Sequence, residues 1–414
     1  MEQLTTHKAL FASIAAFSGF LFGFDTVVIS GADKTLQELW HTTDLFHGWI
    51  VMSMALWGTV LGAVFGYLPT NFIGRKKSLL AIGVLFALSS CGTALADGPW
   101  IFSISRFLGG IGIGVSTIAA PSYISEIAPT KYRGRLVGLY QFNIVFGIVI
   151  AFLSNFYLKD WGVNAWRYML GIQIIPSILF AFGCFFIPES PRWISVQDTS
   201  DTKKNDSIFH LTYRKVLWLT FFVALFNQFS GINAFLYYAP RIFDLAGLDE
   251  NASYLSSVGV GLVNLIFTLL GVSLIDKLGR KTLMYIGGTG YIVSLGLVFL
   301  SFQFHWHGSI VPYFFFLFIA SHAIGQGTVI WVFISELFPD NLRAAGQGFG
   351  STVHWLFAAV IPALIPFLFD KIGAANVFGI FCFSMVIQFI WIRRWMPETK
   401  GKSLEEISEE LSQS

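Results

Sequence analysis

Charged residues are scarce in this sequence of 414 residues. They make up 12% of the chain, against roughly a quarter in a typical soluble domain. Hydrophobic residues, by contrast, make up 55%. A soluble globular protein is therefore excluded, and we expect a membrane protein embedded in a lipid bilayer. The net charge of +2 gives no sign of a nucleic-acid partner.

Cysteine is also rare. Cys91, Cys184 and Cys382 each lie in an apolar stretch, where a small buried thiol is expected instead of a disulfide or a metal ligand. The sequence offers no His, Asp and Glu constellation for a metal and no nucleophile with a base at membrane depth. We therefore expect no metal, no cofactor and no enzyme activity.

Apolar windows of about 20 residues recur along the chain, each long enough for a spanning helix. They cover residues 9–31, 48–70, 78–96, 101–125, 136–157, 166–187, 216–240, 253–275, 282–303, 310–335, 345–369 and 373–395. We predict an all-α membrane protein with twelve transmembrane helices. The first window carries an acid and no small-residue cleavage pattern follows it, which argues against a removable signal peptide.

The basic residues predict the orientation of the chain in the membrane. With both termini in the cytoplasm, 20 of the 26 Lys and Arg residues fall on the cytoplasmic side and four in outer loops. Positive charge is concentrated on the cytoplasmic side of membrane proteins. We therefore expect a multi-pass protein, placed in the plasma membrane, with both ends cytoplasmic.

Asp25 is the one acid that lies deep inside an apolar window. An ionised carboxylate at that depth is costly and marks a functional site by default. Arg106 lies about as far from the outer end of the fourth window as Asp25 does from that of the first. At 1.5 Å per residue, both lie ~9 Å below the same surface. We predict that the two side chains meet.

Three sequence patterns occur twice, in the same order and at offsets of 210, 205 and 209 residues, each about half the chain. Repeats of this kind are typical of transporters with a substrate site between two halves. We predict two six-helix bundles at residues 1–187 and 216–395, a linker at 188–215 and a cytoplasmic tail at 396–414. The repeated patterns are Ser125–Pro129 with Arg133 and Ser335–Pro339 with Arg343, Gly74–Lys76 and Gly279–Lys281, and Pro188-Glu189 and Pro397-Glu398.

Six motifs, spread in order over nearly the whole chain, carry a resemblance to a known family. They are Gly23–Asp25, Arg106–Gly110, Pro188–Trp193, Gln228–Asn233, Asp276–Lys281 and Pro397–Gly401. The chain resembles the sugar porter family of the major facilitator superfamily. The resemblance implies that two rocking six-helix bundles transport a hexose or pentose by alternating access.

The resemblance also implies a sugar site near the midplane. Amide side chains suit sugars because each can both donate to and accept from a hydroxyl, and apolar ring faces suit the C–H faces of a pyranose. Gly231 and Pro240 predict a bend in the seventh helix. Asn227 and His354 depart from the usual side chains, so the particular sugar stays open. The implied site residues are Gln141, Asn227, Gln228, Asn233, Tyr237, Asn264, Trp331, His354 and Trp355.

Acids and arginines repeat at the cytoplasmic ends of the helices. We expect a gating network in which each acid bridges basic groups of the neighbouring bundle; ordinary interfacial anchoring is the alternative. Asn71 and Phe72 replace the usual acid and base of the first motif, so this copy of the network is expected to be weaker than that at Asp276-Lys277. The gate residues are Arg75, Glu126, Arg133, Glu189, Arg280, Glu336 and Arg343.

The Asp25 and Arg106 pair predicts proton coupling. Burial raises the pKa of a carboxylate and a nearby arginine lowers it, so a change in their separation changes the affinity for a proton. We expect a sugar:proton symporter whose partners are a monosaccharide and a proton, with no obligatory protein partner. The alternatives are a static salt bridge, a sugar or polyol uniporter, and a transporter-like sensor, for which the tail after Trp395 is short.

Overall fold

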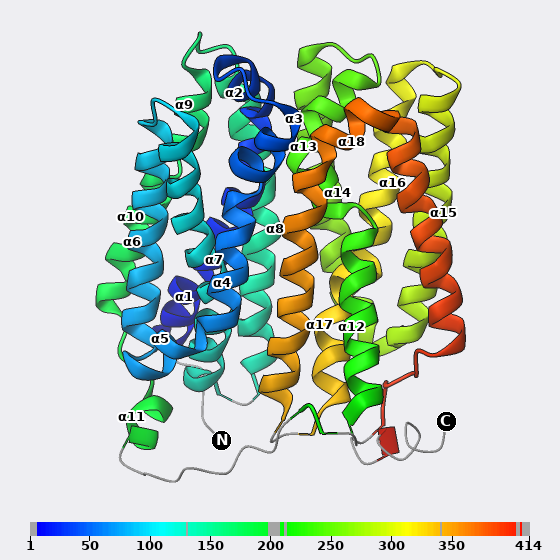
Figure 1. Ribbon diagram of the computed structural model, residues 1–414. Helices are drawn as coiled ribbons and strands as arrows, with labels where there is room; N and C mark the ends of the chain where they lie inside the picture. Colours follow the sequence, from blue (N-terminus) through cyan, green and yellow to red (C-terminus); the bar gives the residue numbers. More distant parts are fainter. Residues whose placement is uncertain are drawn as a thin grey trace. The chain divides into compact units, whose positions relative to one another are not determined.

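Helices account for nearly all of the regular structure in the computed structural model (Figure 1). The structure describes residues 6–129, 131–197, 208–210, 213–339, 342–402 and 406–407, and within these ranges it contains no strand. Residues 198–207 of the predicted linker at 188–215 lie outside the described residues. The principal helices are α1 (Thr6–Val28), α4 (Met54–Phe65), α6 (Arg75–Ala94), α7 (Pro99–Ile127), α8 (Arg133–Leu158), α10 (Ile174–Phe186), α12 (Arg214–Phe229), α13 (Ile232–Leu245), α14 (Glu250–Leu278), α15 (Arg280–Gln303), α16 (Val311–Ile324), α17 (Gln326–Leu337) and α18 (Arg343–Arg394).

The helices agree with the twelve predicted spans. In the described part of the chain, ten helical stretches are long and apolar enough to cross a membrane, and the pair Asp44–Met52 and Met54–Phe65, bent by 42°, makes an eleventh when taken as one span. Gly373, with φ 77°, divides the 52-residue helix α18 into the last two predicted spans. Large apolar side chains such as Leu88, Ile104 and Phe182 are more than half exposed, as expected where lipid replaces water. The chain is a multi-pass membrane protein.

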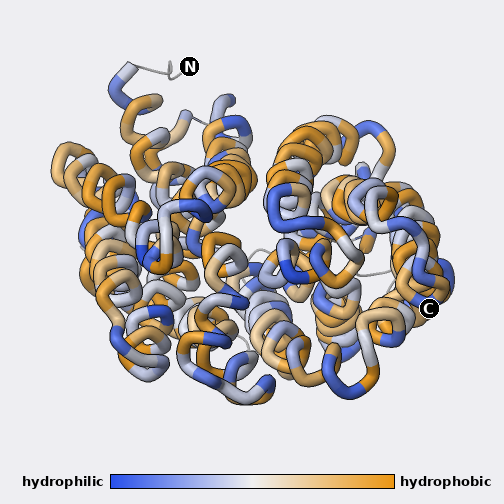
Figure 2. The backbone as a smooth tube through the Cα atoms, turned by 90° about the horizontal axis from the view of Figure 1, so that it is seen from above, coloured by the Kyte–Doolittle hydropathy of each residue, from blue (hydrophilic) through white to orange (hydrophobic). Residues whose placement is uncertain are grey.

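Local sequence explains where individual helices begin. Pro99 opens α7, where its missing N–H costs nothing because the first N–H groups of a helix have no intrahelical acceptor. Asp249 caps α14: its carboxylate accepts from the N–H of Ala252 at 2.9 Å. Figure 2 shows hydrophilic residues (blue) gathered in the connections and hydrophobic residues (orange) over the helices. The loops thus carry the polar groups that cannot face lipid.

The chain forms two compact units. The first comprises Met1–Thr202 with Leu236–Arg241 and Pro362–Leu364, and the second comprises Lys203–Phe235, Ile242–Ile361 and Ile365–Ser414. The division at residue 202 falls inside the predicted linker. The sequence did not predict that short pieces of α13 and α18 cluster with the first unit. In the first unit α1 packs against α8, and α4 and α6 pack against α7; in the second, α14 and α15 pack against α16.

The predicted bend in the seventh span is confirmed. Gly231 adopts a left-handed conformation, with φ 83°, between α12 and α13. A second irregularity follows at Tyr238, with φ −122° and ψ 18°, two residues before Pro240. Glycine tolerates a positive φ because it has no Cβ, and a proline removes a helical hydrogen bond. The two residues thus account for a span made of two helical pieces.

We predict that Gly23→Ala destabilises the protein by about 1–3 kcal/mol, the cost of overpacking a tight contact. A Cβ at Gly23 would overlap the backbone carbonyl of Ile144 on α8, so α1 and α8 would have to separate. Thermal unfolding in detergent would measure the effect. Gly138→Ala on the same helix α8 is the matched control, because a Cβ there meets nothing within 4 Å. Equal unfolding temperatures for the two variants would contradict the prediction.

Candidate functional site

Asp25 on α1 and Arg106 on α7 meet in the interior of the first unit. Arg106 Nη1 donates to Asp25 Oδ1 at 2.8 Å, and its Nη2 donates to the backbone carbonyl of Asp25 at 3.0 Å. The two side chains are only 1% and 2% exposed. The arginine therefore holds one carboxylate oxygen and the backbone of the same residue.

The two carboxylate oxygens of Asp25 differ in their hydrogen bonding. Among the described residues, Asp25 Oδ2 has no hydrogen-bond partner, and neither has Arg106 Nε. Buried polar atoms in native proteins are usually paired. An unpaired carboxylate oxygen beside a paired one is a place where a proton can bind without first displacing a hydrogen bond.

Gln173 is a buried amide next to this pair that the sequence interpretation missed. It precedes α10, and its Nε2 donates to the carbonyl of Leu21 on α1 at 3.1 Å. Ser90 on α6 donates to its Oε1 at 3.4 Å. Gln173 thus ties α1 and α6 together one turn from Asp25. Its place inside the apolar window 166–187 was the signal that could have revealed it.

Three amides of the second unit form a connected group around the break in the seventh span. Gln228 Nε2 donates to Asn227 Oδ1 at 2.9 Å, and Asn233 Nδ2 donates to Gln228 Oε1 at 2.8 Å. Gln228 Nε2 also lies 3.2 Å from Nε2 of His354 on α18. Because α12 ends and α13 begins at the break, residues 228 and 233 face one another across it. The sequence predicted all four residues, and the structure brings them together.

Aromatic rings lie against the amide group. The ring of Trp331 on α17 has its centroid 5.1 Å from that of His354, and the ring of Trp355 lies 5.0 Å away at 84°. Amides that donate and accept, next to flat apolar faces, make a surface suited to a small polyhydroxyl compound. We name Asn227, Gln228, Asn233, Trp331, His354 and Trp355 the amide–aromatic group.

The remaining predicted sugar contacts are Asn264, Gln141 and Tyr237. Asn264 on α14 accepts a hydrogen bond from Thr268 on the same helix at 3.3 Å. Gln141 lies on α8 in the first unit. Tyr237 lies on α13, in the segment Leu236–Arg241 that belongs to the same unit. Tyr237 is fully buried, and its hydroxyl has no hydrogen-bond partner among the described residues. Roles for these three residues in binding sugar stay predictions.

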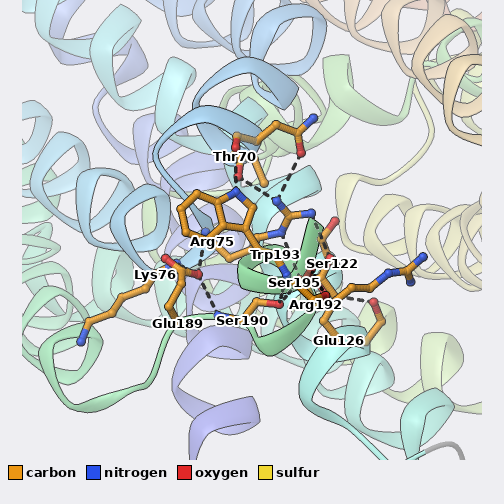
Figure 3. Close-up of polar contacts among 12 residues, drawn as sticks. Thr70, Arg75, Lys76, Ser122, Glu126, Glu189, Ser190, Arg192, Trp193 and Ser195 are labelled. Carbon is orange, nitrogen blue, oxygen red and sulfur yellow. Dashed lines mark hydrogen bonds and ion pairs between the residues drawn. The ribbon is translucent and has the colours of Figure 1, made fainter. Parts of the chain in front are cut away.

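Arg75 and Glu126 form the centre of a charged network in the first unit (Figure 3). Arg75 Nε and Nη2 donate to the two oxygens of Glu126 at 3.0 and 2.9 Å. Glu189 accepts from the backbone N–H groups of Arg75 and Lys76, at the first turn of α6. Negative charge is favoured at a helix N-terminus. Ser190 donates to Glu126. We name Arg75, Glu126, Glu189 and Ser190 the Arg75 cluster.

The second unit repeats this construction. Arg280 Nε and Nη2 donate to Glu336 at 3.0 and 2.7 Å, and Thr399 donates to the same carboxylate at 2.6 Å. Glu398 accepts from the backbone N–H of Arg280 at 2.9 Å. We name Arg280, Glu336, Glu398 and Thr399 the Arg280 cluster. The sequence repeat therefore corresponds to a repeated network.

A glycine is required just before the arginine in both copies. Gly74 and Gly279 have φ of 94° and 90°, which other residues rarely adopt. The carboxylates of Glu189 and Glu398 also occupy the space where a Cβ would lie. Any side chain would thus strain the backbone and expel the carboxylate from the helix end.

Two expectations about the gate need correction. The structure pairs each glutamate with an arginine of its own unit, Glu126 with Arg75 and Glu336 with Arg280, instead of with the neighbouring bundle. The reason is that α6 packs on α7, which carries Glu126, and α15 packs on α17, which carries Glu336. Arg133 and Arg343, expected beside these acids, are the first residues of α8 and α18.

The first copy of the network is also as complete as the second. Asn71 accepts from Arg75 Nη1 at 3.3 Å, where Asp276 pairs with Arg280 Nη1 at 3.2 Å. Asp276 is 84% exposed, so its charge contributes little. Phe72 is mostly exposed. The substitutions at 71 and 72 therefore leave the bidentate pair with Glu126 unchanged.

A second buried acid lies at the end of the first span, which the sequence interpretation also missed. His47 Nε2 lies 2.8 Å from Asp33 Oδ1, and both side chains are buried. Arg241, from the α13 segment of the first unit, pairs with the other oxygen of Asp33 and donates to Gln37. This network fixes the piece of α13 to the first unit. Its members fall between apolar windows, where hydropathy gives no signal.

The two units with matching charged clusters, and the buried polar groups inside apolar spans, define a multi-pass membrane transporter. The model of the family described as "Sugar (and other) transporter" matches residues 11–209 and 195–411. The chain belongs to this family, which confirms the predicted sugar porter membership and the major facilitator fold. Its members are transporters, so the chain is not an enzyme.

Curated relatives match over almost their whole lengths. The chain is 34% identical to the arabinose-proton symporter of Bacillus subtilis (strain 168), over 96% of this chain and 94% of that protein. It is 33% identical to the galactose-proton symporter of Escherichia coli (strain K12), with 96% and 93% covered. A crystal structure of a D-xylose-proton symporter matches with a TM-score of 0.85 at 29% identity, covering 96% of this chain and all of that one.

Proposed function

We propose that this protein is a secondary active sugar:proton symporter for a monosaccharide that works by alternating access between its two halves. The observation that carries the proposal is the buried Asp25 and Arg106 pair with its unpaired carboxylate oxygen. Two relatives whose printed names include proton symport support it. The amide–aromatic group supplies donors, acceptors and ring faces for the sugar.

In this mechanism a proton binds at Asp25 Oδ2. Neutralising the carboxylate removes the charge that attracts Arg106, so the contact between α1 and α7 loosens. Sugar hydroxyls meanwhile replace hydrogen bonds among Asn227, Gln228 and Asn233. Loading of both ligands thus favours the change of access, and release of the proton restores the ion pair. No cofactor is needed, because the proton gradient supplies the energy.

We also propose the membrane and the orientation in which this transport cycle takes place. The concentration of Lys and Arg at one set of helix ends supports a plasma-membrane protein with both termini and both arginine-centred clusters on the cytoplasmic side. There the Arg75 and Arg280 clusters hold the cytoplasmic helix ends within each half, as part of the gate. The halves that move are those predicted at residues 1–187 and 216–395.

Uptake into proteoliposomes tests the proposed function. A panel of arabinose, galactose, xylose and glucose, with a polyol as a further substrate, would be measured with and without an acidic exterior. Symport predicts that at least one sugar accumulates above its external concentration only when the pH gradient is present. Equilibration without accumulation would indicate the uniport alternative. Transport of none of these compounds would contradict the assignment.

We predict that Gln228→Ala and Asn233→Ala each weaken sugar binding without unfolding the protein. Each lost hydrogen bond to a neutral hydroxyl should cost roughly 0.5–1.5 kcal/mol, which is up to about tenfold in affinity. Isothermal titration with the transported sugar would measure the change. Asn376→Ala, an exposed amide on α18 that bonds only to the carbonyl of Ile372 in the structure, is the matched control. Unchanged affinity in both variants would exclude them from the site.

A further inference from the structure

The last span ends in two adjacent arginines that have no partner among the described residues. Arg393 and Arg394 form the last turn of α18, and both are exposed. Glu398, the next acid in the sequence, is already engaged, because it accepts from the backbone N–H groups of Arg280 and Lys281 at 2.9 and 3.0 Å. The two arginines therefore present positive charge that no acid in the described part of the chain balances.

A cavity of about 490 Å³ lies at these arginines. Its lining consists of Ile390, Arg393, Arg394 and Trp395. Ile390 and Trp395 are 56% and 49% exposed, so the cavity opens outward from the helix. Ligand pockets measure roughly 300–1,000 Å³, and one guanidinium can hold two oxygens of a phosphate at once. The cavity thus has the size and the charge to receive a group that carries a phosphate.

Trp395, which forms one wall of the cavity, belongs to a cluster of tryptophans. The ring of Trp218 on α12 has its centroid 5.5 Å from that of Trp395, at 68°, and 6.0 Å from that of Trp391. Trp391 is buried, so the cluster is anchored in the second unit. Tryptophan is enriched at the level of the lipid headgroups in membrane proteins. The cluster therefore indicates that the cavity lies at headgroup depth.

An apolar stripe of α18 leads from the lipid-exposed part of the helix to the arginines. Phe383, Ile387 and Ile390, which we name the apolar stripe, are 66%, 44% and 56% exposed. They are spaced by four and three residues, and Arg394 follows four residues after Ile390, so all four share one helix face. A lipid chain that lies along the stripe brings its headgroup to Arg394.

We propose that Arg393, Arg394 and Trp395 form a binding site for the phosphate of an anionic phospholipid whose acyl chain lies along the apolar stripe. An anionic lipid is favoured over a zwitterionic one, because the zwitterionic headgroup carries a cation that the arginines repel. A helix dipole also favours arginine in the last turn, but that effect requires neither the cavity nor the stripe. The inference is independent of the sugar and of the proton.

Lipid titration followed by native mass spectrometry tests the site on the full chain. Phosphatidylglycerol should bind more tightly than phosphatidylcholine. Arg393→Gln combined with Arg394→Gln should weaken phosphatidylglycerol binding by roughly thirtyfold, about fivefold for each charge, and leave phosphatidylcholine binding within about twofold. Lys131→Gln combined with Arg135→Gln, two exposed basic residues at the beginning of α8, removes the same charge elsewhere and is the matched control. Equal losses in the two double variants, or equal binding of the two lipids to the unmodified protein, would overturn the proposal.

Competition separates a lipid headgroup from a soluble phosphate. A lipid is confined to the membrane or micelle beside the cavity, which raises its effective concentration there. Inorganic phosphate and glycerol phosphate at the same total concentration should therefore displace little phosphatidylglycerol. Displacement by either compound at concentrations equal to those of the lipid would overturn the assignment to a lipid.

Thermal unfolding in detergent separates the site from an effect on the helix dipole. A ligand that binds only the folded protein raises its unfolding temperature. Phosphatidylglycerol should thus stabilise the unmodified protein and the control variant more than it stabilises the variant without the two arginines. A variant that loses stability but keeps the full response to phosphatidylglycerol would show that the arginines act only on the helix, and would overturn the proposal.

Discussion

Replacing Asp25 with asparagine is expected to abolish sugar accumulation driven by a pH gradient and to spare downhill exchange. An amide cannot take up and release a proton at this position. One pH unit corresponds to about 1.4 kcal/mol, so a one-to-one symporter can reach about tenfold accumulation. The variant should fall to a ratio of about one. Uptake into proteoliposomes with an acidic exterior measures this ratio.

The Asp25→Asn variant also distinguishes proton symport from the alternative in which Asp25 and Arg106 form a static salt bridge. The introduced asparagine would keep an oxygen that can accept from Arg106, and the bond from Arg106 to the backbone carbonyl is unaffected. If the pair only holds two helices together, the loss of charge should instead destabilise the protein, by up to ~3–5 kcal/mol for a broken buried pair. Asp370→Asn, at an exposed pair with Lys371, is the matched control. A stable Asp25→Asn protein that still concentrates sugar would end the symport hypothesis.

The second large effect is expected at the Arg75 cluster. In Glu126→Gln the side chain is neutral, so the Arg75 guanidinium loses the negative charge that balances it. An amide also has only one oxygen, so it can accept only one of the two hydrogen bonds from Arg75. The side chains of Arg75 and Glu126 are 14% and 8% exposed. The loss of stability should therefore lie between the ~1 kcal/mol of an exposed pair and the ~3–5 kcal/mol of a buried one, nearer the upper value. Thermal unfolding in detergent would report it.

Glu336→Gln provides an internal comparison for this prediction. Its carboxylate is 27% exposed, so water can replace part of the lost interaction and the loss of stability should be smaller. Glu38→Gln, at an exposed acid on the short helix Asp33–Leu39, should be nearly neutral. A Glu126→Gln variant as stable as Glu38→Gln would show that the cluster contributes nothing to stability.

The membrane spans and the pairing of Asp25 with Arg106 could be predicted because each depends on a single quantity that can be read from the sequence. Hydropathy over 20 residues locates a span, and depth along two spans places Asp25 and Arg106 at one level. The partner of Glu126 could not be predicted in this way. Arg75 is 51 residues away in sequence, and the packing of α6 on α7 brings the two side chains together.

Buried polar residues without a repeated motif were also missed. Gln173, Tyr291 and His322 each occur singly among apolar neighbours, so neither a repeat nor the family resemblance selects them. Their partners lie on other helices, at sequence separations of 31 to 152 residues. A sequence pattern reports the neighbours along one helix and cannot report these contacts.

The self-contained networks also have a consequence for the order of synthesis. Every member of the Arg75 cluster precedes residue 191, so the first half can complete its network as soon as its six spans have entered the membrane. The Arg280 cluster must wait for Glu398 and Thr399, which are made after the last span. A nascent chain therefore carries one finished half while the other is still being made. The early half needs no charge from the late one to neutralise the half-buried Arg75.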